Sequence, residues 1–211
     1  LVREAIDRVS DSVTVQELVE LARRLGIESW EDALKSIIDQ ARANDIAHTR
    51  LAAFGERNVR ELLAHFPAPT ADDLDALLVH TIETAIPELE KRATGKKNTA
   101  DYIALAHETL RVVRSRTATW ADWVRLSNGA PEAGLKTIAQ PVTDLASRFV
   151  AHPRLRQDIE QYLAAIFTLA AKALDAYAQR KRELGVIDFV DQEHLFLGLL
   201  EKPAVTEVLS K

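Results

Sequence analysis

Four basic side chains in one stretch of the sequence could bind phosphate groups. Arg111 and Arg114 are expected to share one face of a helix with His107, because the three residues are spaced at i, i+4 and i+7. Lys96 and Lys97 precede that helix in a polar, basic loop. Since cationic side chains neutralise phosphates without reading bases, these four residues are a candidate DNA-binding site. The alternative is a solvated basic helix face, which is the usual meaning of such a pattern.

The distribution of charge along the chain favours that region for contact with a polyanion. Residues 1–90 carry 9 basic and 18 acidic side chains, whereas residues 91–116 carry 7 basic and 2 acidic ones. We call residues 91–116 the basic segment. The whole chain of 211 residues has a formal net charge of −5. A basic segment in an acidic chain is more informative than the overall balance.

The sequence lacks the residues that thiol chemistry, metal binding and ATP binding require. The chain has no Cys, which excludes disulfides, thiol catalysis and Cys-ligated metal centres, and which fits the reducing cytoplasm where we expect the protein. The six histidines form no His-x-x-x-His pair, so we predict no metal site. Residues 95–99, Gly-Lys-Lys-Asn-Thr, lack the upstream glycine and the preceding strand of a Walker A loop. We therefore expect no ATP binding by this chain itself.

Two tryptophans, Trp120 and Trp123, have aromatic faces on which bases could stack. Their spacing of three places them on one side of a helix, which favours packing against another helix. Both interpretations remain open at the level of sequence, with packing favoured.

The elements that position these residues are predicted to be helices. The sequence is 47% hydrophobic with only 7 Gly and 7 Pro, and it shows no alternating strand pattern. Ser29 with Asp32, and Thr70 with Asp73, have the spacing of helix N-terminal caps. Pro87 is expected to kink or end the helix that follows the second cap. The predicted fold class is all-α, an irregular multi-helix subdomain with one long helix of about 30 residues.

The long helix is predicted between Pro153 and Gly185, and its length is typical of a strut between regions of a protein. A final helix follows, and Asp188 and Asp191 lie at its start. We interpret Asp188 as its N-cap and Asp191 as a favourable charge at the positive end of the helix dipole. A direct role of the two carboxylates in catalysis or metal binding is the alternative.

Residues 176–195 carry a more specific pattern, Ala-Tyr-Ala-Gln-Arg-Lys-Arg-Glu-Leu-Gly-Val-Ile-Asp-Phe-Val-Asp-Gln-Glu-His-Leu. This stretch resembles the segment just upstream of the Walker B motif in UvrD/Rep-type superfamily 1 DNA helicases. Residues 192–195, together with the Trp-Ala-Asp-Trp-Val-Arg-Leu run at 120–126, look most like the AddA/RecB branch of helicase–nuclease subunits. Val190 and Gln192 depart from the commoner residues of the signature.

The resemblance implies that residues 1–185 form the helical 1B subdomain and that residues 186–211 return to the first RecA-like ATPase domain. The parent enzyme would use ATP and Mg²⁺ to translocate on DNA and unwind it, while this part contacts the DNA backbone, holds no cofactor and has no ATPase activity. Asp188, Phe189 and Asp191 would mainly order the returning segment. The implied partners are DNA, the rest of the helicase core and a second helicase–nuclease subunit, and a nuclease domain in the parent is left open.

A competing interpretation is a free-standing helical interaction or adaptor protein without catalysis. The sequence begins at Leu1 and contains no Met, so we expect a piece of a longer protein or a sequence that has lost its methionines. The most apolar run is short and is interrupted by Lys172, so no membrane-spanning segment is predicted.

Overall fold

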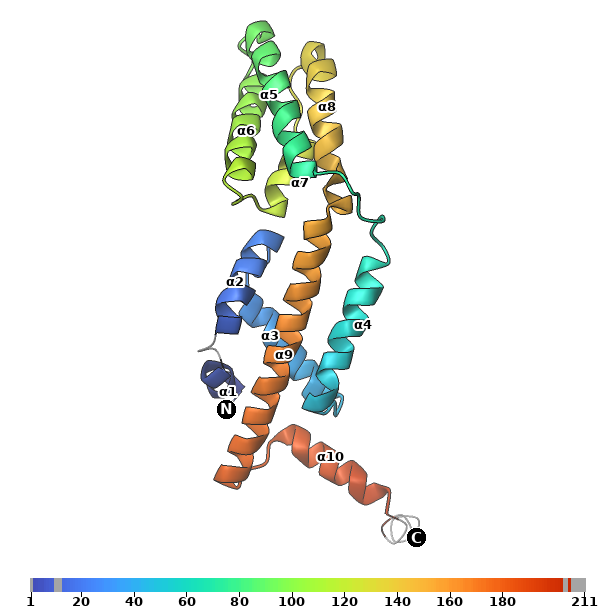
Figure 1. Ribbon diagram of the computed structural model, residues 1–211. Helices are drawn as coiled ribbons and strands as arrows, with labels where there is room; N and C mark the ends of the chain where they lie inside the picture. Colours follow the sequence, from blue (N-terminus) through green and yellow to red (C-terminus); the bar gives the residue numbers. More distant parts are fainter. Residues whose placement is uncertain (1, 10–12, 203–204, 206–211) are drawn as a thin grey trace. The chain divides into compact units, whose positions relative to one another are not determined.

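The computed structural model describes residues 2–9, 13–202 and 205, and the regular structure within these residues is helical (Figure 1). The described residues contain no strand, which confirms the predicted all-α class. The chain divides into two compact units, each assembled from separate stretches. Unit 1 comprises Leu1–Leu18, Ser29–Asn58 and Leu163–Lys211, whereas unit 2 comprises Val19–Glu28 and Val59–Tyr162.

Unit 1 combines helices from the beginning and the end of the chain. Its elements are α1 (Val2–Val9), the start of α2 (Val13–Leu25), α3 (Trp30–Ala43), the 3₁₀ turn η1 (His48–Arg50), most of α4 (Leu51–Leu63), the second part of α9 (Pro153–Leu184) and α10 (Phe189–Leu200). Buried residues of this unit include Leu34 and Ile38 of α3 and Leu169 and Ala173 of α9. Each of these pairs is four residues apart, so each helix turns one apolar side inward.

Unit 2 contains three helices that lie side by side, α5 (Leu74–Arg92), α6 (Lys97–Arg114) and α8 (Lys136–Ser147) (Figure 1). Helix α5 packs against both α6 and α8, and α7 (Trp120–Asn128) also contacts those two helices. The 3₁₀ turns η2 (Ala133–Leu135) and η3 (Arg148–Ala151) flank α8, and the unit also holds the ends of α2 and α4 and the first part of α9. Its fully buried side chains include Leu78, Ile82, Leu89, Trp123 and Leu126.

Local capping residues set one predicted helix start correctly and another incorrectly. Ser29 caps α3 as predicted, because its hydroxyl accepts a hydrogen bond from the Asp32 backbone N–H at 3.1 Å. The predicted cap at Thr70 is wrong. Asp73 caps α5 and accepts from the Ala76 N–H, while the Thr70 hydroxyl accepts from the Asp72 N–H in the turn before the helix.

Pro87 lies inside α5, which continues to Arg92, so of the two expected outcomes the helix end is excluded and the kink stays a prediction. A proline removes one backbone hydrogen bond and costs about 3 kcal/mol in a helix interior. Ile86 and Leu89 beside it are buried, and the burial of such side chains offsets that cost.

Helix α9 confirms the predicted long helix, with 32 residues from Pro153 to Leu184. Gly185 follows with a φ of +63°, the left-handed conformation that ends helices and that glycine adopts without strain. The described residues after Gly185 belong to unit 1 together with the second part of α9. The expected domain boundary between residues 185 and 186 stays a prediction.

Candidate nucleic-acid interface

Lys96 and Lys97 lie at the N-terminal end of α6, where Lys96 is the N-cap residue. Lys96 Nζ lies 2.9 Å from a carboxylate oxygen of Glu132, and Lys97 Nζ lies 2.5 Å from one of Asp101. The Lys97 side chain is 87% exposed, and exposed ion pairs of this kind contribute little to stability. Both ammonium groups therefore already have a carboxylate partner.

Of these two carboxylate partners, Glu132 is the more buried and has more hydrogen bonds. Its side chain is only 9% exposed, and it accepts a hydrogen bond from the Thr94 hydroxyl at 2.8 Å. The Glu132 backbone N–H in turn donates to the Thr99 hydroxyl at 3.1 Å. Hydrogen bonds from Lys96 and Thr94 hold the pKa of the Glu132 carboxyl below its ordinary value. An internal carboxylate thus occupies the start of α6, a position that favours anions.

Arg111 and Arg114 lie in the last turn of α6, and Arg111 is about 21 Å from Lys97 along the helix axis. Arg111 donates to Glu108 on the preceding turn at 2.6 Å. Arg114 forms an ion pair with Glu83, which belongs to the neighbouring helix α5. The four predicted residues therefore do not form one cluster. Lys96 and Lys97 lie at the start of α6, and Arg111 and Arg114 lie at its end.

The ion pairs change what the charge count along the basic segment means. Two of the carboxylate partners, Glu83 and Glu132, come from outside residues 91–116 and are absent from that count. A phosphate that approaches Lys96 or Arg114 must compete with a carboxylate that is already in place. The segment is therefore less available to a polyanion than its sequence indicates.

Trp120 and Trp123 are buried, with 5% and 0% of their surface exposed, which confirms the packing interpretation. The Trp120 indole N–H donates to Asp158 at 2.9 Å, and Arg24 donates to the other oxygen of the same carboxylate at 2.6 Å. Asp158 is itself 1% exposed. These tryptophans support the core of unit 2 and present no open face for a base.

Asp188 and Asp191 form a reciprocal capping box at the start of α10. The Asp188 carboxylate accepts from the Asp191 backbone N–H at 3.0 Å, and the Asp191 carboxylate accepts from the Asp188 N–H at 2.9 Å. This geometry confirms the capping interpretation of Asp188. Phe189, the third residue of the signature, is 83% exposed.

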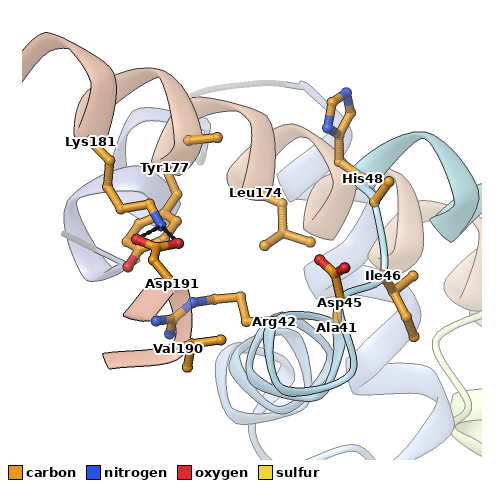
Figure 2. Close-up of a pocket in the computed structure, with 12 residues that line it drawn as sticks. Ala41, Arg42, Asp45, Ile46, His48, Leu174, Tyr177, Lys181, Val190 and Asp191 are labelled. Atoms are coloured by element: carbon orange, nitrogen blue, oxygen red, sulfur yellow. Dashed lines mark hydrogen bonds and ion pairs between the residues drawn. The ribbon is translucent and has the colours of Figure 1, made fainter. Parts of the chain in front are cut away.

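Three side chains from α3 and α9 hold these two carboxylates. Arg42 donates to Asp188 at 2.7 Å, and the Tyr177 hydroxyl donates to the same oxygen. Lys181 Nζ lies 2.5 Å from an oxygen of Asp191 (Figure 2). Burial acts to raise the pKa of Asp188, but the hydrogen bonds from Tyr177, the Asp191 backbone and Arg42 outweigh it and hold this pKa well below its ordinary value. Burial and the bond to Asp188 raise the pKa of Tyr177 well above its usual range.

An open pocket of about 190 Å³ adjoins this cluster (Figure 2). Its lining includes Arg42 of α3, Tyr177 and Lys181 of α9 and Asp191 of α10. The Arg42 and Lys181 cations beside it are engaged with Asp188 and Asp191. Within the part of the chain that the structure describes, no three His, Asp or Glu side chains are placed to share a metal ion. What the cluster does is fasten α10 to α3 and α9.

Arg42, Tyr177 and Lys181 did not figure in the sequence-based site. Tyr177 and Lys181 are four residues apart, so their common helix face could have been inferred from the sequence. Arg42 is 146 residues from Asp188 and carries no local signal of that contact.

No family model, no curated protein and no solved structure matches this chain. Among the described helices, none combines the length and the apolar composition that crossing a membrane requires.

Proposed function

We propose that residues 1–185 are the helical 1B subdomain of a UvrD/Rep-type superfamily 1 DNA helicase of the AddA/RecB-like branch, and that residues 186–211 begin the return to its first RecA-like domain. In this proposal the subdomain contacts the DNA backbone, while ATP and Mg²⁺ are bound by a RecA-like part of the parent enzyme. The observation that carries the proposal is the stretch 176–195, whose sequence resembles the helicase signature and which forms the end of α9, the Gly185 stop and the start of α10. The parent would act in the cytoplasm in DNA repair or recombination, together with a second helicase–nuclease subunit.

The contacts of the signature residues support a structural role for them. Asp188 and Asp191 each accept a backbone hydrogen bond and each face a cation. Carboxylates engaged in this way order the segment after the long helix. We therefore assign no catalytic step to either of them.

The apolar surface of α10 supports a covering partner. Phe189, Leu195, Phe196, Leu197 and Leu199 are between 46% and 83% exposed. Several large apolar side chains exposed on one short helix usually mark an interaction site. In the proposal, the rest of the helicase core covers it.

A free-standing interaction or adaptor module is the second candidate, because the same α10 surface could dock any partner protein. DNA binding separates the two candidates. The helicase proposal requires affinity for a phosphate backbone, whereas an adaptor needs none.

The test is fluorescence anisotropy of the 211-residue chain with labelled single-stranded and duplex DNA of several sequences, at 50 to 200 mM salt. We expect weak binding that varies little with sequence and falls steeply with salt, by about 0.7 in log–log slope per phosphate contact on single strands and about 0.9 on duplex. Absence of binding at the lowest salt would overturn the proposal and favour the adaptor. Strong dependence on base sequence would also count against it, because backbone contacts carry no sequence information.

A further inference from the structure

Two arginines and one aromatic ring form a distinct surface at the start of α4. Arg50 ends η1, and Phe54 and Arg57 follow at i+4 and i+7, so the three residues share one helix face. The guanidinium carbon of Arg50 lies 5.8 Å from the centre of the Phe54 ring, and that of Arg57 lies 5.5 Å from it. We call these three residues the α4 patch.

The two guanidinium groups of the patch have no carboxylate partner in the described part of the chain. Both arginines are exposed, and Phe54 is half-buried beneath them. This sets them apart from the four cations of α6, each of which is paired with a Glu or Asp. The α4 patch therefore keeps both of its positive charges available.

The ring orders the guanidinium groups without neutralising them. An aromatic face attracts a cation through its quadrupole but carries no net charge. A guanidinium held over a ring still presents N–H donors at its edge, in the fork that matches phosphate oxygens. An ion pair, by contrast, uses those donors on a carboxylate.

The patch also rests on a packed support. Leu51 is 2% exposed, and a Cβ added at Gly55 would lie 3.1 Å from the Cβ of Phe167 on α9, so α4 lies close against α9 at that point. Binding residues on a packed helix are held more firmly than residues on a loop.

We propose that Arg50 and Arg57, positioned by Phe54, bind phosphate groups of a nucleic-acid backbone. The inference rests on the proposed function and deepens it by naming a phosphate-contacting surface outside the basic segment. The two guanidinium carbons lie 5.8 and 5.5 Å from the centre of one ring, so one nucleic-acid strand that passes the ring can present a phosphate to each arginine. Phe54 acts as a positioning residue in this arrangement.

The test uses the 211-residue chain and a labelled 20-nucleotide single strand, followed by anisotropy across a salt series. We expect R50Q/R57Q to lower the affinity about tenfold and to reduce the log–log salt slope by about 1.4, since two phosphate contacts are lost. Lys35→Gln/Lys172→Gln is the charge-matched control, because both lysines are exposed residues of unit 1 without an ion pair in the described residues. The control should have the smaller effect on both affinity and slope.

Phe54→Leu gives a second readout, because it keeps both charges. We expect an affinity loss of about threefold with an unchanged salt slope, which a loss of charge cannot produce. Circular dichroism melting of each variant must match the parent chain, so that a folding defect is not read as lost binding.

The outcomes separate this inference from the function on which it rests. If the parent chain binds no DNA, the proposed function and the patch assignment both fail. If it binds DNA but R50Q/R57Q behaves like the lysine control, only the patch assignment fails. Poly-glutamate that competes as well as unlabelled DNA, charge for charge, would make the patch a general polyanion or protein site and would also overturn the inference.

Discussion

The α4 patch and the basic segment of α6 both present exposed arginines on a helix face, yet they hold them by different means. In α6, Arg111 and Arg114 are each held by a glutamate. In the α4 patch, Arg50 and Arg57 are held by a phenylalanine ring. A carboxylate cancels the charge that it orders, whereas a ring leaves that charge in place. Local net charge is therefore a poor guide to which cations are free to meet a phosphate.

Arg42 lies between these two cases, because it has both kinds of partner. It stands over the Tyr177 ring at 4.8 Å and donates to Asp188 at 2.7 Å. Its task is structural, since it fastens the start of α10 to α3. An arginine with a carboxylate partner alone forms a neutral surface pair, as in α6. One with both a carboxylate and a ring is a structural clamp, as Arg42 is, and one with a ring alone keeps its charge available.

The largest effect is expected where the carboxylate that pairs with a cation is buried, as Asp158 is. Asp158→Ala leaves Arg24 and the Trp120 indole without their acceptor in the core of unit 2, and removal of one partner of a buried ion pair costs about 3–5 kcal/mol. Urea unfolding measures this loss. Glu108→Ala removes the exposed partner of Arg111 and should leave the urea midpoint unchanged. Equal shifts for the two variants would show that burial does not distinguish these pairs.

Removal of the carboxylates that pair with Arg111 and Arg114 should leave these two arginines unpaired, like those of the α4 patch. Glu83→Gln/Glu108→Gln frees Arg114 and Arg111, so we expect DNA affinity to rise about tenfold and the salt slope on single strands to steepen by about 1.4. Anisotropy against Glu28→Gln/Glu31→Gln, which makes the same change in net charge, isolates the effect of pairing. A rise of the same size in both variants would mean that only the total charge matters.

Addition of a carboxylate next to the α4 patch should pair its arginines, as the arginines of α6 are paired. Ala53 is exposed and lies four residues before Arg57 and three after Arg50. Ala53→Glu therefore places an acid within reach of both, in the favourable order for an i, i+4 pair with Arg57. We expect about a threefold loss of DNA affinity, measured by anisotropy against Ala53→Gln. If both variants bind alike, the patch arginines do not contact phosphate.

A last prediction concerns pH and the Arg42 clamp. The pKa of Asp188 is held below its ordinary value, so its interactions stabilise the fold fully above the ordinary pKa of an aspartate and are lost as pH falls through the lower, folded-state value. Asp188→Asn should therefore be less stable than the parent chain at pH 7 and approach it as the solution is acidified towards pH 2. Urea titration at both pH values measures the gap. A gap that is constant with pH would contradict an ionised Asp188 in the clamp.

Much of the fold could be predicted because its signals are local. The cap at Ser29, the stop at Gly185 and the long apolar stripe of α9 depend on residues within a few turns of each other. The helix does not end at Pro87, because burial of Ile86 and Leu89 outweighs the loss of one backbone hydrogen bond. The ion pairs of Lys96 and Arg114 in the candidate site could not be predicted, since these residues meet carboxylates that lie far away in the sequence.

The sequence by itself determined the helical class, the start of α3, the bounds of α9 and the capping role of Asp188, because backbone conformation and capping follow from neighbours along the chain. The spacing of Arg50, Phe54 and Arg57 was equally present in the sequence, although nothing local says that their charges stay unpaired. Only the tertiary structure decided which cations are neutralised. Glu83 reaches Arg114 and Glu132 reaches Lys96 through helix packing, and Coulomb attraction depends on distance in space rather than on separation along the chain.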